Sequence, residues 1–366
     1  MVSPELLKKA FESIIEPVTG KTLGELRAVG GVEKKNEKET CVRLQFGFPA
    51  DRLLGEIERQ IAEKFQEGNG GELSFDVTTQ ILSHRVKAGL KPLRGVKNIL
   101  AVTSAKGGVG KSTVAVNLAL ALKRIGARVG ILDADIYGPS VPLLLGVTGK
   151  PTPVDEKAMK PVDFHGMPVN SIGFFVSENE PLAWRGPVAS RAIRDLAEKT
   201  EWGELDYLVI DFPPGTGDIQ LTLAQSVPLT AALVVTTPQT LACADAARGL
   251  RLFEKVGIPV LGIVENMAYY RCSGCQRIEY LFGKGGTDAL SNQFGVPLLG
   301  SLPITVEATT KLGEGHVEEE KAELTQFDEE IEKIAIRTVA SLSRMPRDWT
   351  SVMPGVKVDT GTDKTA

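Results

Sequence analysis

Two short stretches of the 366-residue chain carry residue types whose spacing indicates chemistry. The first, TSAKGGVGKST (103–113), combines closely spaced glycines with two lysines. Glycines let backbone N–H groups converge on phosphate oxygens, and a lysine can reach the β- and γ-phosphates of a nucleotide. The second, ENMAYYRCSGCQ (265–276), contains a close cysteine pair, Cys272 and Cys275. Two thiolates are half of the four ligands that zinc or an iron–sulfur cluster usually takes.

The first stretch has the context of a phosphate-binding loop. It follows a short apolar run and precedes a helical pattern over 114–123, which predicts strand, loop and helix in that order. We expect Lys111 to bridge the β- and γ-phosphates of ATP and the Ser112 hydroxyl to ligate Mg²⁺. The strict pattern starts with glycine, and here that position is Ala105. The predicted nucleotide-binding residues are Ala105, Lys106, Gly107, Gly108, Val109, Gly110, Lys111, Ser112 and Thr113.

Three carboxylates follow buried-strand patterns elsewhere in the chain. Asp133 and Asp135 lie in LDADIYGPS, and Asp211 lies in LVIDFPPGTGD. In open α/β sheets, ligands bind beyond the C-terminal ends of the strands, so these side chains are expected beside the nucleotide. We expect Asp211 to hold Mg²⁺ through water and Asp135 to orient or deprotonate the attacking water. Asp133 would support the metal shell or the loop conformation, and the order of these two aspartates stays open.

The elements that must position these residues predict an α/β fold. From residue 98 onward, short uninterrupted β-branched runs alternate with helical patterns. Strands without polar alternation are buried on both faces, which predicts a doubly wound, mostly parallel sheet between helices, as in P-loop NTPases. An amphipathic helix over 328–343 closes this domain. The strand runs are NILAVTS, VGILDAD, DYLVIDF, AALVVTT, VLGIVEN and PLLGSLP.

A smaller α+β domain is expected before the ATPase domain. Helical spacing covers 4–15 and continues after Asp51, and strand patterns cover 40–46 and 73–82. A basic segment containing Gly and Pro reads as a linker, and the polar end of the chain reads as disordered. The predicted organisation is a small α+β domain over 1–86, a linker over 87–97, the P-loop ATPase domain over 98–345 and a tail over 346–366.

Composition limits the class of partner. The formal net charge of −4 gives no electrostatic argument for binding nucleic acid or an anionic membrane. No apolar run is long enough to span a bilayer, and the N-terminus lacks the pattern of a secretion signal. Four cysteines in a chain of this length do not make a disulfide scaffold, so a cytoplasmic protein is expected.

The motif KGGVGKST resembles the variant phosphate loop of the MinD, ParA and nitrogenase iron-protein class. That resemblance implies that Lys106 reaches across a dimer interface to phosphates held by the other subunit, where its charge would act like an arginine finger. It also implies that Asn266, at the end of VLGIVEN, contacts the purine base. A turn-capping role is the alternative for this asparagine.

The cysteine stretch, together with four others, resembles the Mrp/ApbC family of iron–sulfur cluster carrier ATPases over roughly 96–305. The other stretches are YLFGKGG, LDADIYGPSVPLLLG, WRGPV and DYLVIDFPPGTGDIQLTLAQ. The resemblance implies a homodimer in which Cys272 and Cys275 of both subunits bridge one [4Fe–4S] cluster. It further implies that the cluster is passed to apo-proteins, with client proteins and cluster scaffolds as partners.

The N-terminal stretch EPVTGKTLGELRAVGGV is similar to the SufT/PaaD-like iron–sulfur assembly domain. FGFPADR (46–52) lacks the cysteine that this family often has there, which favours partner docking over metal binding. Cys41 is expected in a strand and Cys243 in a helix core.

Three alternatives remain open at this point. The thiolates could hold a structural zinc in an ATPase scaffold or act as a redox dithiol. The chain could also be a MinD/ParA-type positioning switch, although its Pro- and Gly-containing tail does not form the basic membrane helix of MinD. The acidic segment 314–323 suggests no function.

Overall fold

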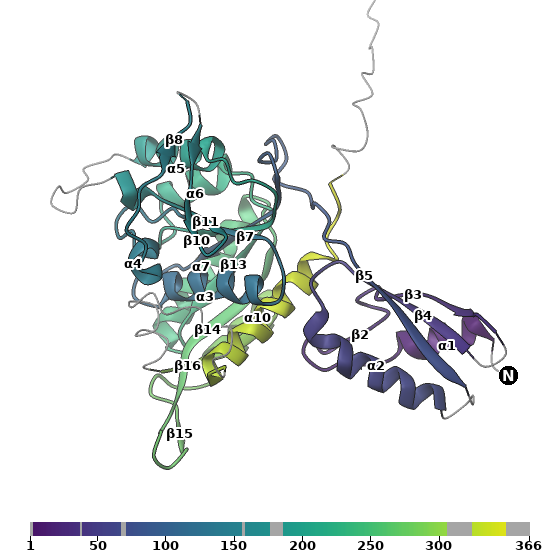
Figure 1. Cartoon of the computed structure of the whole chain (residues 1–366). Coiled ribbons are helices and arrows are strands. Elements are labelled where there is room, and N and C mark those ends of the chain that lie inside the picture. The colour runs from purple at the N-terminus through teal and green to yellow at the C-terminus, as the bar shows by residue number, and fades with distance from the viewer. Residues whose placement is uncertain are drawn as a thin grey trace, which may run out of the picture.

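The computed structural model describes residues 3–36, 39–66, 71–155, 158–175, 186–305 and 324–348. A larger α/β unit and a smaller α+β unit are joined by an extended segment (Figure 1). Trp184 and Arg185 of the WRGPV stretch, the acidic segment 314–323 and the chain after Asp348 lie outside the described residues. Within these ranges, no helix has the length and apolarity needed to cross a bilayer.

The larger unit contains a nine-stranded sheet in the order β10-β11-β7-β12-β6-β13-β14-β15, with β16 paired to β14. All neighbouring pairs are parallel except β10–β11 and β14–β15. This confirms the predicted mostly parallel sheet and adds an antiparallel strand at each side. The strands are β6 (Val96–Thr103), β7 (Val129–Asp133), β10 (Val162–Phe164), β11 (Met167–Ser171), β12 (Leu205–Asp211), β13 (Ala231–Thr236), β14 (Val260–Arg271), β15 (Ile278–Glu279) and β16 (Leu298–Ile304).

Helices cover both faces of this sheet because alternate strand residues point to opposite sides. Leu100 and Val102 of β6 join one hydrophobic cluster with α3 and α10, whereas Ile99 and Ala101 join a second cluster with α5 and α6. The sheet is therefore doubly wound, as expected. The helices are α3 (Lys111–Arg124), α4 (Val141–Leu145), α5 (Gly186–Lys199), α6 (Asp218–Ser226), α7 (Thr240–Lys255), α8 (Gly286–Phe294) and α10 (Gln326–Leu342), with a 3₁₀ turn η1 (Ile172–Phe175).

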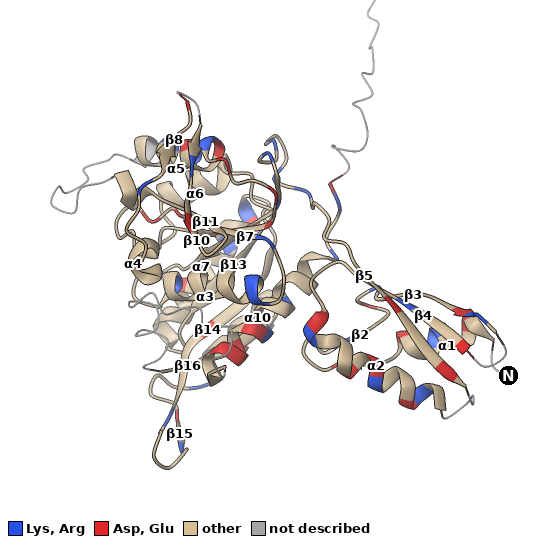
Figure 2. Ribbon diagram, viewed as in Figure 1, with Lys and Arg blue, Asp and Glu red and all other residues tan. Residues whose placement is uncertain are grey.

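Helix α10 starts two residues earlier than the periodicity predicted, because of its cap. The Thr325 hydroxyl accepts from the Asp328 N–H, and the Asp328 carboxylate accepts in return from the Thr325 N–H. Acidic residues therefore gather at this end of α10, where the helix dipole favours them (Figure 2).

In the smaller unit, α2 crosses over between two parallel strands of a three-stranded sheet, β3-β4-β5. The predicted strand over 40–46 is β4, and the predicted helix from Asp51 is α2. The strand β3 was not predicted, because Gly30 and Gly31 interrupt its pattern. The elements of the smaller unit are α1 (Pro4–Glu12), β1 (Ile15–Glu16), β2 (Lys21–Thr22), β3 (Val29–Lys34), β4 (Glu39–Phe46), α2 (Asp51–Gln66) and β5 (Glu72–Thr79). Two further short strands, β8 (Thr152–Pro153) and β9 (Met159–Lys160), belong to the larger unit.

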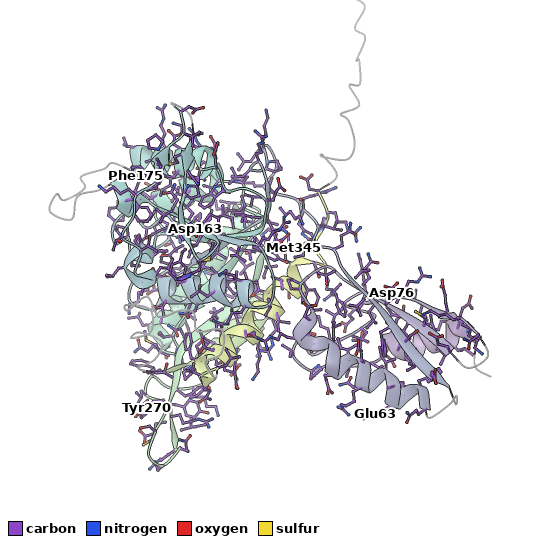
Figure 3. The ribbon with its side chains drawn as sticks, viewed as in Figure 1. Glu63, Asp76, Asp163, Phe175, Tyr270 and Met345 are labelled. Carbon is purple, nitrogen blue, oxygen red and sulfur yellow. The ribbon has the colours of Figure 1, made fainter. Side chains whose placement is uncertain are left out.

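The two units contact each other beside the end of α10, near Met345 (Figure 3). The Arg337 guanidinium, on α10, donates to Val18 O at 2.6 Å and to Leu299 O at 2.6 Å. The connecting segment is also fastened, since the Arg85 N–H donates to Pro346 O and the Asp348 N–H donates to Ser83 O. One hydrophobic cluster continues through both units.

Candidate functional site

The predicted phosphate-binding loop connects β6, which ends at Thr103, to α3, which begins at Lys111. Gly108 and Gly110 both have φ +79°, a backbone conformation that favours glycine. A Cβ on Gly110 would also collide with Asn266 Nδ2, whereas a Cβ on Gly108 would meet open space. The loop is therefore shaped by its own glycines and by close packing of β14 against one of them.

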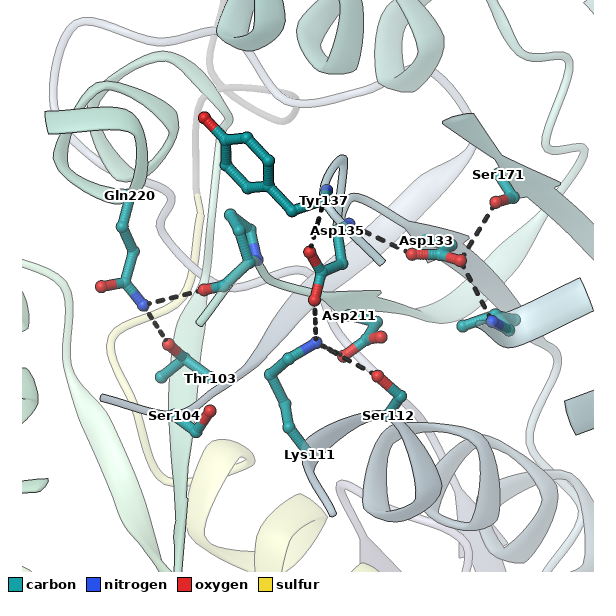
Figure 4. Close-up of polar contacts among 12 residues, drawn as sticks. Thr103, Ser104, Lys111, Ser112, Asp133, Asp135, Tyr137, Ser171, Asp211 and Gln220 are labelled. Carbon is teal, nitrogen blue, oxygen red and sulfur yellow. Dashed lines mark hydrogen bonds and ion pairs between the residues drawn. The ribbon is translucent and has the colours of Figure 1, made fainter. Parts of the chain in front are cut away.

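Lys111 lies at the centre of a buried polar cluster (Figure 4). Its Nζ forms an ion pair with Asp211 Oδ1, lies 3.5 Å from Asp135 Oδ2 and donates to Ser112 Oγ at 3.3 Å. Lys111 is 6% exposed and Asp211 is fully buried. The sheet topology thus brings the predicted lysine together with two of the three predicted aspartates.

Asp211 presents an acceptor that lacks a donor. Its Oδ2 is buried without a hydrogen-bond partner among the described residues. Burial raises the pKa of this carboxyl, and the Lys111 charge opposes that shift. An unsatisfied buried carboxylate oxygen beside a serine hydroxyl suits hydrated Mg²⁺, a cation that takes oxygen ligands and keeps several waters. Asp211 and Ser112 therefore fit the predicted Mg²⁺ site.

The other two aspartates have different surroundings. Asp133 accepts from the Asp135 N–H at 3.1 Å, from the Val141 N–H at 3.1 Å and from Ser171 Oγ at 3.0 Å. Burial, followed by the charge of Asp211, raises the pKa of Asp133 to about 7. By accepting the Asp135 and Val141 N–H groups, Asp133 therefore fixes the conformation of the loop that follows it. Asp135 faces Lys111, and its Oδ1 accepts the Tyr137 N–H at 3.3 Å.

Gln220 belongs to this cluster and was missed by the sequence analysis. Its Nε2 donates to Thr103 Oγ1 at 2.5 Å and to Pro213 O at 3.2 Å, which ties the end of β6 to the loop after Asp211. Gln220 also lines a cavity of about 530 Å³ together with Tyr137 and Pro213. A polar residue on the buried side of α6 was the available signal.

Two residues whose roles came from the family resemblance lie on the same loop or against it. Lys106 is exposed, and its carbonyl accepts the Ser104 hydroxyl at 2.9 Å. Asn266 is buried, and its Nδ2 donates to Val109 O at 2.9 Å. The contact of Asn266 with a purine and the action of Lys106 across an interface stay predictions.

The cysteine pair lies at the tip of a hairpin. The strand predicted to end at Asn266 continues as β14 to Arg271 and pairs with β15, so that Cys272 and Cys275 fall in the intervening turn. This arm projects from the body, as the position of Tyr270 shows (Figure 3). Cys272 is half-buried and Cys275 is exposed, and both thiols are free. The backbone N–H of Cys275, then that of Gly274, lowers the pKa of Cys272.

The hairpin supplies two ligands and not four. Among the described residues, no group of three or more His, Cys, Asp or Glu side chains is placed to hold a metal ion. Cys243 is a buried residue of α7 with Sγ 3.4 Å from Thr237 O, and Cys41 lies on β4, both as predicted. A four-ligand site at the hairpin therefore requires donors that the described residues of a single chain do not supply.

Comparison with known proteins identifies a family for the larger unit. The model of the ParA-type family described as NUBPL iron-transfer P-loop NTPase matches residues 95–339. The iron-sulfur cluster carrier protein of Pseudomonas fragi is 52% identical over 242 residues, covering 66% of this chain and 84% of that protein. The protein of the same name from Haemophilus influenzae is 43% identical over 312 residues, covering 85% of this chain and 84% of that protein.

A solved structure shows the same fold. It is a nucleotide-binding protein from Archaeoglobus fulgidus in complex with ADP, 39% identical, with a TM-score of 0.55, covering 62% of this chain and 90% of that one. The resemblance seen in the ATPase sequence is confirmed, whereas the SufT/PaaD-like assignment of the first 86 residues stays a prediction. The chain belongs to the ParA-type family of NUBPL iron-transfer P-loop NTPases.

Proposed function

We propose that this protein is an ATP-dependent iron–sulfur cluster carrier. Two copies would hold one [4Fe–4S] cluster between Cys272 and Cys275 of each subunit and deliver it to apo-proteins. The observation that carries the proposal is a pair of free thiols, one half-buried and one exposed, that supplies half of a ligand set on an arm that starts at the nucleotide site. The relatives' name, iron-sulfur cluster carrier protein, supports it.

The nucleotide chemistry follows from the buried cluster. ATP binding would draw Lys111 Nζ from the aspartates to the β- and γ-phosphates, because three phosphates offer more negative charge than two carboxylates. Asp211 and Ser112 would hold Mg²⁺, which when bound neutralises charge developing on the phosphates. Asp135 would orient the attacking water or accept its proton, and Asp133 would hold the loop that places Asp135.

Cluster delivery would proceed by ligand exchange. Each client thiolate that binds an iron releases one hairpin thiolate, so charge and oxidation state balance without an added reductant. An exposed hairpin tip lets a client approach, and free thiols suit the reducing cytoplasm. The partners would be a second copy, cluster scaffolds and apo iron–sulfur proteins, with no role for nucleic acid or membrane.

Anaerobic reconstitution with iron and sulfide tests the cluster site. The parent protein is expected to bind about four iron and four sulfide per dimer, and Cys272→Ala is expected to bind almost none. Cys41→Ala, in the smaller unit, is the matched control and should load like the parent. Equal loading of Cys272→Ala, or zinc without sulfide in anaerobically isolated protein, would contradict the proposal.

The action of Lys106 across the interface can be tested by mixing two inactive variants. Lys106→Ala and Asp135→Asn should each lose ATP hydrolysis when assayed alone. In mixed dimers, the Lys106→Ala subunit keeps Asp135 and receives Lys106 from its partner, so an equal mixture should recover about a quarter of the parent rate. If Lys106 serves its own subunit, the mixture stays inactive.

A further inference from the structure

A single strand touches both proposed sites. Strand β14 passes the phosphate-binding loop at Asn266 and reaches the cysteine turn after Arg271. From Met267 to Cys272 the strand spans five residues, or roughly 17 Å at about 3.3 Å per residue. The nucleotide loop and the thiols are therefore joined by one short, hydrogen-bonded segment.

The strand is clamped immediately before it reaches the loop. The buried carboxylate of Glu265 accepts from Thr287 Oγ1 at 2.5 Å and from Ser301 Oγ at 2.8 Å. Thr287 belongs to α8 and Ser301 to β16, so β14 is fixed on two sides at this point. Movement that begins at Asn266 can then pass toward the hairpin more easily than back into the sheet.

The strand departs from regular pairing directly after the clamp. Glu265 pairs with Ser301 and Tyr269 pairs with Pro303, so residues 266–268 of β14 stand opposite the single residue Leu302 of β16. Met267, within this bulge, has φ +55°, an uncommon conformation for a side chain of its type. Bulges redirect a strand and are adjustable because their extra residues are unpaired.

The bulge is packed on the phosphate-binding loop. Asn266 Nδ2 donates to Val109 O at 2.9 Å, and a Cβ on Gly110 would overlap Asn266 Nδ2 and come into van der Waals contact with Met267 Cε. When phosphates bind, the N–H groups of the loop turn to them, and the Val109 carbonyl belongs to that same backbone. The Asn266 contact can therefore differ between the empty and the nucleotide-bound loop, as a coupling requires.

We propose that the bulge at 266–268 couples the nucleotide state of the phosphate-binding loop to the orientation of the cysteine hairpin. Asn266 senses the loop through the Val109 carbonyl, Glu265 is the fixed point, and the segment after Met267 moves the thiols. The inference deepens the proposed function, because it names how ATP would control cluster retention. Its test needs no iron.

Hydrogen–deuterium exchange of the full-length protein is the test, measured with and without Mg²⁺ and a non-hydrolysable ATP analogue at saturating concentration. In the parent, exchange should change both at 104–115 and across the hairpin at 268–281, by about fivefold or more in the hairpin. Unchanged exchange in the hairpin when 104–115 responds overturns the proposal.

Asn266→Asp separates the two responses. It preserves the size of the side chain but replaces the donor with an acceptor that Val109 O repels. Because Asn266 is also the predicted purine contact, a nucleotide titration read from exchange at 104–115 first sets the concentration that saturates the variant. At that concentration 104–115 should respond and the hairpin should not, and a full hairpin response in this variant overturns the proposal.

Substitutions at Met267 provide a second, independent arm. Met267→Gly makes the backbone of the bulge more flexible and should weaken the hairpin response. Met267→Asn also tolerates a positive φ but leaves the backbone less flexible than glycine does, so this variant should retain the response. Equal responses in both variants overturn the role of the bulge. If cluster reconstitution fails while the exchange pattern appears, the proposed function falls and the coupling stands, and the reverse outcome is equally distinguishable.

Discussion

Lys111 forms ion pairs with two carboxylates, Asp135 and Asp211, and its charge compensates groups that would otherwise be unpaired in the interior. The glycines, the lysine and the strand-end aspartates could be identified from the sequence because each lies at a fixed offset from a buried strand. Glu265 could not, because its partners are contributed by α8 and β16 and no local spacing encodes these contacts.

Replacing Lys111 with methionine should abolish ATP hydrolysis and also lower stability. The buried Asp211 carboxylate would lose its ion pair, at a cost of about 3–5 kcal/mol. The double variant Lys111→Met/Asp211→Asn should recover much of that stability and none of the hydrolysis. Urea unfolding and phosphate release measure the two effects, and a single variant as stable as the parent would contradict the buried pairing.

The two left-handed glycines of the loop should differ in their tolerance of a methyl group. Both substitutions incur the backbone cost of positive φ, about 1–2 kcal/mol. Gly110→Ala must in addition displace Asn266, whereas Gly108→Ala meets no atom within 4 Å. The free energy of unfolding without nucleotide should therefore fall further for Gly110→Ala. Equal losses would show that β14 does not press on the loop.

At the scale of elements, the buried parallel strands were predictable because their apolar runs are uninterrupted. The hairpin was not, because its sequence has no apolar periodicity and its path is fixed by pairing with β16 and β15. A buried polar contact that was not predicted joins the end of the predicted smaller domain, before the linker, to the start of the ATPase domain. His84 is buried, with Nδ1 2.9 Å from Asn98 Oδ1, and Asn98 Nδ2 donates to Leu82 O.

This histidine should make the junction sensitive to acid. Burial lowers the pKa of His84 from its ordinary value near 6.5, and the neighbouring Arg347 lowers it further. The unfolded chain then binds more protons, so the stabilisation is present above about pH 6.5 and is lost as the pH falls below it, by at most about 1.4 kcal/mol per pH unit.

Urea unfolding of the parent and of His84→Gln between pH 7.5 and pH 5 tests this expectation. The parent should lose stability relative to the variant as the pH falls, because glutamine cannot take up the proton. A pH-independent difference between parent and His84→Gln would contradict the assignment.

At the scale of the whole molecule, two units are joined by polar contacts to backbone carbonyls, which composition alone could not reveal. Arg337→Ala removes the donors to Val18 O and Leu299 O, each contributing about 1.5–3 kcal/mol. Amide exchange at 16–22 should become at least about tenfold faster. Arg248→Ala, whose partner Asp245 is on the same helix, is the matched control. Unaltered exchange at 16–22 would show that the units are held together by other contacts.

The exposed position of Cys275 has a consequence for a population of molecules under oxidative stress. If each dimer needs both hairpins intact, one oxidised hairpin also disables the undamaged copy beside it. The fraction of dimers with two intact hairpins then equals the square of the fraction of undamaged chains. If about three quarters of the chains are undamaged, only about nine sixteenths of the dimers have both hairpins intact. Oxidation of one chain would therefore also remove the function of the unmodified chain that is paired with it.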